Sequence, residues 1–230
     1  MAFASAGFQI ISLPRPSASV LEEFDALPVD PYCGGNHRFR RFSQYKLEWM
    51  GHSWLLTLLP HRPFIQSKQY NSFAGGIPRH LEPLRIDPFP QIQAAAEIID
   101  LDRTRAWQLN VHQCRVVATA DTPGISVPEG PHRDGHEIGM VAVFRRHNIA
   151  GGETHLLANG GTGEPFFTHV LRENEAVVYR DEEMFHFATD VRALDDTGGY
   201  RDLWIVAVNS WENRRYGDDF EAGALAKASQ

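Results

Sequence analysis

The stretch of the sequence that is richest in chemistry is Pro-His-Arg-Asp-Gly-His-Glu-Ile-Gly, at residues 131–139. On an extended strand, side chains two positions apart point the same way, so His132 and Asp134 would share one face while Arg133 turns away. An imidazole beside a carboxylate could form a simple hydrogen bond at the surface, or the two groups could be two ligands of a metal ion. With a second histidine, the pair would make the facial triad of non-haem Fe(II) oxygenases, which leaves metal positions open.

A second histidine must come from another part of the chain. His186 is favoured because it alternates with Phe185 and Phe187 in a late apolar segment, although a histidine buried and satisfied in the core would look the same. The histidines considered for this position are His112, His136, His147, His155, His169 and His186.

Arg201 precedes the apolar run at 203–208, where a buried guanidinium would need an anionic partner. The planar fork of an arginine matches both oxygens of a carboxylate. That carboxylate belongs either to a ligand or to Asp195, Asp196 or Asp202 of the chain itself. Asp202 is the weaker internal partner, because its side chain should point to the other face of the strand.

The order His132-x-Asp134, His186 and Arg201 resembles the Fe(II)/2-oxoglutarate-dependent dioxygenases. The segments VHQCRV, PEGPHRDG, AGGETHLL and DEEMFHFATDV, followed by GYRDLWIVAV, are similar to the small bacterial family that includes isoleucine dioxygenase and biofilm-associated BsmA-like proteins. The similarity runs through roughly residues 107–210 and is weaker before them.

This resemblance implies a double-stranded β-helix, or jelly roll, with the metal at one open end. It makes His132, Asp134 and His186 the Fe(II) ligands and the catalytic centre, and it makes Arg201 the partner of the far carboxylate of 2-oxoglutarate. With O2, such an enzyme would hydroxylate a small substrate. Characterised members of the similar family hydroxylate free aliphatic L-amino acids, so the resemblance implies a substrate of that class. A fourth protein ligand would take a position that the co-substrates need, so His136 is expected to make a hydrogen bond behind the metal ligands instead.

Contacts to the substrate are more weakly indicated. Gln113 and Arg115 on the preceding strand, together with Arg133, could meet a substrate carboxylate, and Thr154 could reach the site from a tight turn. Each could equally be an ordinary polar group. Glu137 opens an apolar run and is expected to be structural.

Two other functions stay open at this stage. One is a cupin-like metal enzyme that uses no 2-oxo acid, and the other is a non-catalytic protein that senses iron or 2-oxoglutarate. Arg201 argues against the first, because such an enzyme would have no need of it.

The composition of the chain indicates which partners and which cellular compartment to expect. The 230 residues carry a net charge of −7 and no clustered basic patch, which argues against a nucleic-acid partner. No apolar run is long enough for a membrane span, and the N-terminus does not resemble a signal peptide. With only Cys33 and Cys114, the sequence favours a reducing compartment, and we expect the cytoplasm. The sequence is compatible with a monomer or a homodimer.

The pattern of apolar residues predicts a mainly β chain with a few N-terminal helices. Helices are expected at 17–27, where Ser19 and Glu22 are placed for a capping box, and at 88–102, while 67–84 is expected to be a surface excursion or part of a lid. Strands are expected at 38–49, 53–59, 107–119, 136–146, 153–158, 166–171, 175–180, 184–191 and 201–210.

The run at 203–208 is apolar on both faces and should be a central strand. We expect one domain over 1–230, with helices and supporting strands in 1–105, the β-helix core with the metal site in 106–212, and a tail at 213–230.

Overall fold

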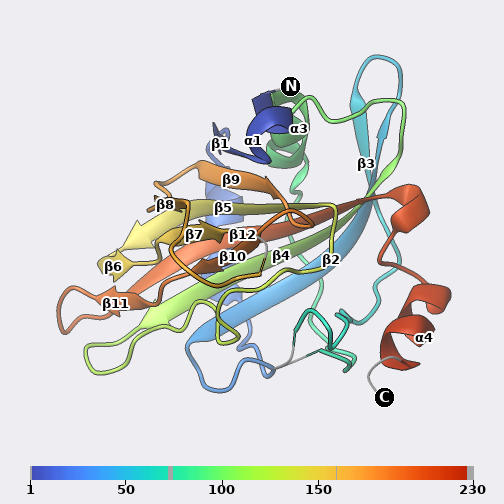
Figure 1. The fold of residues 1–230 in the computed structure, drawn as a ribbon. Coiled ribbons are helices and arrows are strands. Elements are labelled where there is room, and N and C mark those ends of the chain that lie inside the picture. Colours follow the sequence, from blue (N-terminus) through green and yellow to red (C-terminus); the bar gives the residue numbers. More distant parts are fainter. Residues whose placement is uncertain (1, 72–74, 159, 227–230) are drawn as a thin grey trace.

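A computed structural model describes residues 2–71, 75–158 and 160–226, and over these residues its largest element is an antiparallel sheet of seven strands (Figure 1). In spatial order the strands are β1 (Phe8–Ser12), β9 (Glu175–Arg180), β5 (Ile138–His147), β12 (Gly199–Ser210), β4 (Trp107–Ala118), β2 (Arg38–Trp49) and β3 (Trp54–Leu58). The apolar run at 203–208 lies in β12, between β5 and β4, so the prediction of a central strand is confirmed.

Smaller sheets complete the β architecture. Strand β7 (Thr154–Leu157) pairs with both β10 (Phe185–Ala188) and β8 (Phe167–His169), and β6 (Ile149–Gly151) pairs with β11 (Val191–Ala193). Leu156 of β7 is fully buried in one apolar cluster with side chains of β4, β5 and β9. The small sheets therefore cover one face of the large sheet, as the predicted jelly roll requires.

The alternation of side chains along β12 separates two environments. Trp204, Val206 and Val208 point into the main hydrophobic core, whereas Leu203 packs in the second cluster on the other face. Arg201 has the same parity as Leu203, so the backbone register sends its side chain towards the small sheets.

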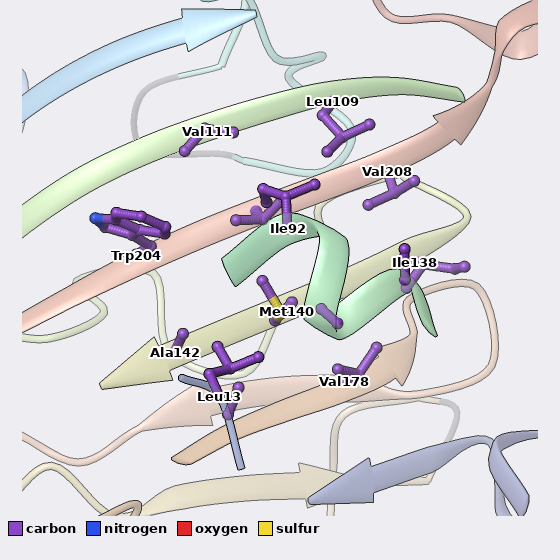
Figure 2. Close-up of a cluster of buried hydrophobic side chains, with 14 of the residues drawn as sticks. Leu13, Ile92, Leu109, Val111, Ile138, Met140, Ala142, Val178, Trp204 and Val208 are labelled. Atoms are coloured by element: carbon purple, nitrogen blue, oxygen red, sulfur yellow. The ribbon is translucent and has the colours of Figure 1, made fainter. Parts of the chain in front are cut away.

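Helices cover the opposite face of the large sheet. Helix α3 (Phe89–Ile98) lays Ile92 over side chains of β4, β5, β9 and β12 (Figure 2). Helix α2 (Ala18–Glu22) continues into the 3-10 turn η1 (Glu23–Ala26), which buries Phe24, and α1 (Ala2–Ala6) precedes β1. Each fully buried leucine- or phenylalanine-sized side chain contributes about 1.5–3 kcal/mol to this core.

Several boundaries differ from the predictions. The cap of α2 is Ser17, whose hydroxyl accepts from the amide of Val20 at 3.4 Å, and not Ser19. The stretch predicted as one strand at 184–191 is divided into β10 and β11. Elements that the sequence patterns did not predict are β1, β6, α1, the 3-10 turn η2 (Trp211–Asn213) and helix α4 (Asp218–Ala226) within the expected tail.

Helix α4 is attached by charge rather than by a large apolar face. Arg62 donates from Nη2 to Glu221 at 3.1 Å, and it also pairs with Asp218. The 67–84 segment, of which 72–74 lie outside the described residues, is not purely a surface excursion, because Arg79 pairs with Phe64 through both backbone groups and is buried. In the described part of the chain, no helix combines the length and the apolar character needed to cross a membrane.

Truncating a core side chain tests this arrangement. Leu109 is 1% exposed beneath α3, so Leu109→Ala should lower the free energy of unfolding by about 2–5 kcal/mol through lost burial and the cavity left behind. Urea denaturation followed by circular dichroism measures it. The matched control is Leu58→Ala on β3, where the side chain is 61% exposed and the change should stay within about 0.5 kcal/mol. Equal effects in the two variants would contradict this packing.

Candidate metal site and its cavity

His132, Asp134 and His186 form a group that could hold a metal ion. One ligand atom from each lies within 4.8 Å of the other two. The Nε2 atoms of His132 and His186 are each 3.5 Å from an oxygen of Asp134. Two imidazole nitrogens and one carboxylate oxygen are a donor set that suits Fe(II) and leaves other metal positions open.

Backbone pairing places the two histidines side by side. The amide of His132 donates to the carbonyl of His186 at 3.1 Å, and the amide of His186 donates back at 2.9 Å. Their ring centroids are 4.3 Å apart. His132 also bonds through Nδ1 to the carbonyl of Gly130 at 2.9 Å, which leaves Nε2 directed towards the other ligands.

Asp134 is not on a strand. Strand β5 begins at Ile138, two residues after the start that the sequence predicted. The amides of Asp134, Gly135 and His136 all donate to the carboxylate of Asp181, at 3.0, 2.7 and 3.0 Å, instead of entering a ladder. Strand periodicity is therefore not what brings Asp134 beside His132. Gly135 turns the loop with φ of 80°, and a Cβ there would lie 2.4 Å from the Tyr70 ring.

Asp181 joins both ligand segments. Its side chain is 1% exposed, and its Oδ1 lies 3.5 Å from Nδ1 of His186 in addition to the amide that it accepts from Asp134. A buried carboxylate with three backbone N–H donors is well satisfied, and its loss would leave those donors without partners. Asp181 thus positions the loop that carries Asp134 and the ring of His186 together.

Asp134 is held as a carboxylate. Burial raises its pKa, but hydrogen bonding and charge from His132 and His186 outweigh burial and hold the pKa well below its ordinary value. The amide of Gln66 also donates to Oδ1 of Asp134 at 2.9 Å. An ionised, oriented carboxylate is the form that a metal ligand needs.

His136 and Glu137 have the supporting positions expected of them. Nδ1 of His136 lies 2.8 Å from the side-chain amide of Asn209, so this buried ring has a hydrogen bond behind the ligands. Oε1 of Glu137 accepts from the hydroxyl of Ser210 at 2.6 Å and from Asn213 at 2.9 Å. Both side chains therefore support the end of β12.

The other histidines considered as ligands are not in the ligand group, although His112 lines the same cavity as that group. His155 and His169 are paired with Glu153 and Glu175, at 2.7 and 2.9 Å, and His147 is exposed beside Tyr200. His112 is buried between the rings of Phe42 and Phe64, each 4.6 Å away. Burial and the neighbouring Arg40 and Arg79 lower the pKa of His112 well below its ordinary value.

One cavity contains the candidate metal ligands and Arg201. Its walls between them include the apolar side chains of Val141, Leu203 and Ile205. Thr154 and Tyr179 line the same cavity, and a Cβ at Gly139 would lie 2.5 Å from the Tyr179 ring, so the glycine leaves room for it.

Arg201 is a buried cation without an internal counter-ion. It is 1% exposed, its Nε and Nη2 atoms have no hydrogen-bond partner in the described part of the chain, and burial and Arg146 lower its pKa to about 9. Within the described residues, no ion pair joins it to Asp195, Asp196 or Asp202. Thr154 Oγ1 and Tyr179 OH are likewise buried without partners there. These orphaned donors fit a negatively charged ligand inside the cavity.

Asp202 uses its charge on the other face of the sheet. Its two oxygens accept from Arg115 Nε and Arg145 Nε, both at 2.6 Å. Arg115 also contacts Asp25 at 2.7 Å. These side chains form a structural ion network, which is why Arg115 does not line the cavity.

Two more residues considered for substrate contact also lie outside the cavity. Gln113 has the parity of Arg115 on β4 and is buried opposite Trp204, on the helix-covered side. Arg133 turns outward, donates to the carbonyl of Glu182 at 3.0 Å and stacks on Phe185. Of the suggested substrate contacts, only Thr154 lies in the cavity.

Several residues of the site were not predicted from the sequence. A sequence signal existed for two of them, because the alternation in His-Arg-Phe-Arg-Arg (37–41) places Arg38 and Arg40 on one face of β2. The others belong to loops or distant strands, where spacing carries no information. The unanticipated side chains are Arg38, Arg40, Gln66, Arg79, Glu129, Asp181 and Asn209.

Comparisons with known proteins agree with this geometry. The model of the 2OG-Fe dioxygenase family matches residues 21–207. The chain is 25% identical over 162 residues to L-isoleucine-4-hydroxylase of Bacillus thuringiensis, covering 66% of this chain and 67% of that protein.

Two solved structures share the fold. A BsmA homologue from Methylobium petroleophilum has a TM-score of 0.75 at 23% identity, over 91% of this chain and 90% of its own. IDO from Bacillus thuringiensis has a TM-score of 0.69 at 22% identity, over 91% and 96%.

Changing Asp181 tests how the ligand group is positioned. Asp181→Asn replaces one acceptor oxygen with an NH2 group that faces N–H donors, so Co(II) or Fe(II) should bind about 10–100-fold more weakly. Isothermal titration measures the metal affinity, and thermal denaturation should show a loss of stability. Asp121→Asn, at an exposed carboxylate, is the control and should change neither. Unchanged metal affinity in the Asp181 variant would rule out its positioning role.

Proposed function

The chain belongs to the 2OG-Fe dioxygenase family, an enzyme family that uses Fe(II) and 2-oxoglutarate, and on this premise we propose that it hydroxylates a free aliphatic L-amino acid. The observation that carries the proposal is a single cavity that contains a two-histidine, one-carboxylate group and an unpartnered, buried arginine. A cupin-like enzyme without a 2-oxo acid would have no use for that arginine. Membership of an enzyme family also argues against a purely sensory role.

His132, Asp134 and His186 are the proposed iron ligands. Their donor atoms are close together, Asp134 is ionised, and Asp181 and Gln66 orient the ligand segment. When bound, Fe(II) with 2-oxoglutarate and O2 supplies the oxidation that converts the 2-oxo acid to succinate and CO2 and puts one oxygen atom on the substrate.

Arg201 is the proposed partner of the far carboxylate of 2-oxoglutarate. Its Nε and Nη2 atoms can donate to both oxygens of a carboxylate, and this ligand would remove the cost of an unpaired buried cation. The hydroxyls of Thr154 and Tyr179 are further donors in the same cavity. Apolar walls from Val141, Leu203 and Ile205 suit the methylene groups of the co-substrate and exclude water.

The amino-acid substrate is supported by one curated relative. That relative is an L-isoleucine-4-hydroxylase, and the similarity extends over two thirds of its length. The cavity itself supports a small polar substrate, because the metal ligands and Arg201 share it with the further charged side chains of Arg79 and Glu129. Side-chain hydroxylation of a free amino acid is the activity that agrees with both observations.

Turnover tests the proposed function directly. Purified protein with Fe(II), ascorbate, O2 and 2-oxoglutarate should form succinate faster when one aliphatic L-amino acid is present, and that amino acid should gain about 16 mass units from one oxygen atom. Liquid chromatography with mass spectrometry measures both products. His132→Ala is the negative control. Failure of every amino acid to stimulate succinate formation, in protein shown to bind iron, would reject the proposed substrate class.

The role of Arg201 has a signature that does not depend on the substrate. Arg201→Met removes a buried unpaired cation, so without 2-oxoglutarate the variant should melt no lower than wild type. The rise in melting temperature that 2-oxoglutarate gives the wild type with Co(II) should disappear, and the KM for 2-oxoglutarate should rise about 10–100-fold. Arg192→Met, on the exposed side of β11, is the control. A normal 2-oxoglutarate response in the Arg201 variant would overturn the assignment.

A further inference from the structure

The charged groups of the cavity are not all neutralised within the protein. Arg40 forms a buried ion pair with Asp30 at 2.8 Å. Among the described residues, Arg79 has no carboxylate within ion-pair distance, although it is 4% exposed, and its Nε atom has no hydrogen-bond partner. Since burying a cation without an anion is costly, Arg79 is suited to a negatively charged ligand group.

Glu129 is the opposite case in the same cavity. Its side chain is 14% exposed, and within the described chain no lysine or arginine lies within ion-pair distance of it. The side-chain amide of Asn71 donates to Oε1 of Glu129 at 3.0 Å, and Nε2 of His132 lies 4.0 Å from the same oxygen. A carboxylate placed there is suited to a cationic ligand group.

Both groups are held next to the candidate metal ligands. Nη2 of Arg79 donates to Oε1 of Gln66 at 3.1 Å, and Gln66 in turn donates to Asp134 at 2.9 Å. Arg79 also stacks on the ring of Phe64, 4.3 Å away. Glu129 lies beside His132, three positions before it. Arg79 and Glu129 therefore lie next to the metal ligands on two different segments, and within the described chain neither is paired with an oppositely charged arginine, lysine or carboxylate.

We propose that Arg79 and Glu129 form a head-group subsite that binds the α-carboxylate and the α-ammonium of a free amino acid. The inference rests on the proposed function and adds how the substrate is selected. The subsite binds the positive and the negative charge of the zwitterion at the same time. A molecule anchored at these two points presents its side chain to the metal. The subsite would discriminate against compounds that lack either charge, because one buried group would then stay unpaired.

Arg38 is the other cavity arginine that could bind the carboxylate. It donates from Nη2 to the carbonyl of Ser126 and is only half-buried, whereas Arg79 is nearly fully buried. Burial and Arg40 lower the pKa of Arg79 to about 10, which reflects the same lack of an anion. The more buried, uncompensated cation gains more from a ligand carboxylate, so Arg79 is preferred.

The test compares Arg79→Gln, Arg79→Lys, Arg38→Gln and Glu129→Gln with two surface controls, Arg85→Gln and Glu164→Gln. Arg79→Gln and Glu129→Gln should raise the KM for the amino-acid substrate about 10–100-fold, the loss expected for a hydrogen bond to a charged group. The affinities for Co(II) and 2-oxoglutarate should stay at wild-type values. Arg79→Lys should recover part of the loss.

Substrate analogues assign the two charges separately. The N-acetyl derivative and the primary amide of L-isoleucine should both be poor ligands of the wild type. Glu129→Gln should lower the preference for the amino acid over its N-acetyl derivative, and Arg79→Gln should lower the preference over its amide. A larger effect from Arg38→Gln than from Arg79→Gln would overturn the carboxylate assignment, and loss of Co(II) affinity in Glu129→Gln would overturn the ammonium assignment.

The outcomes separate this proposal from the proposed function. If the wild type hydroxylates an amino acid while Arg79→Gln and Glu129→Gln keep its KM, only the subsite is wrong. If no amino acid is hydroxylated, binding of the L-amino acid panel to the Co(II) and 2-oxoglutarate form, measured by isothermal titration, decides. Binding that the two variants lose would retain the subsite and reject the reaction, and no binding would reject both.

Discussion

The candidate site depends on one buried carboxylate, Asp181. The candidate metal ligands come from two segments that are far apart in the chain: His186 lies 52 positions after Asp134. Asp181 accepts three consecutive amides from the segment that carries Asp134, and it lies beside the ring of His186. Together with the backbone pairing of His132 and His186, it converts a Gly-containing loop into a positioned set of donors. Without it, three buried N–H groups would compete for other partners and the loop would lose its conformation.

The protein treats charge differently on the two faces of its large sheet. On the helix-covered face, Asp202 is fully buried but is neutralised by Arg115 and Arg145, so charge there is structural. In the cavity on the other face, Arg40 is paired with Asp30, but Arg201 and Arg79 are buried without an anion from the described chain. Two residues that follow one another, Arg201 and Asp202, thus have opposite roles, because consecutive side chains of a strand point to opposite faces.

Unpaired buried charge is a cost that the folded chain accepts at its functional cavity. The core under α3 and the ion network around Asp202 offset this cost with ordinary packing and pairing. Ligands that carry the complementary charges would then bind with the added benefit of neutralising buried groups. This explains how one cavity could hold two anionic partners, a 2-oxo diacid at Arg201 and an amino-acid carboxylate at Arg79, in separate places.

Period-two patterns and residue types in the sequence were enough to predict the β-rich class and the central strand at 203–208. They were also enough to single out His132, Asp134, His186 and Arg201 as candidates for one site. The sequence could not show that residues 134–136 lie outside a strand, because their conformation depends on Asp181, 45 residues beyond His136. Nor could it exclude Arg115, since the parity of Gln113 and Arg115 has meaning only when the helix-covered face of β4 is known. The tertiary structure alone decided which polar groups are left without partners, because hydrogen bonding and ion pairing between distant segments depend on three-dimensional proximity and not on spacing along the chain.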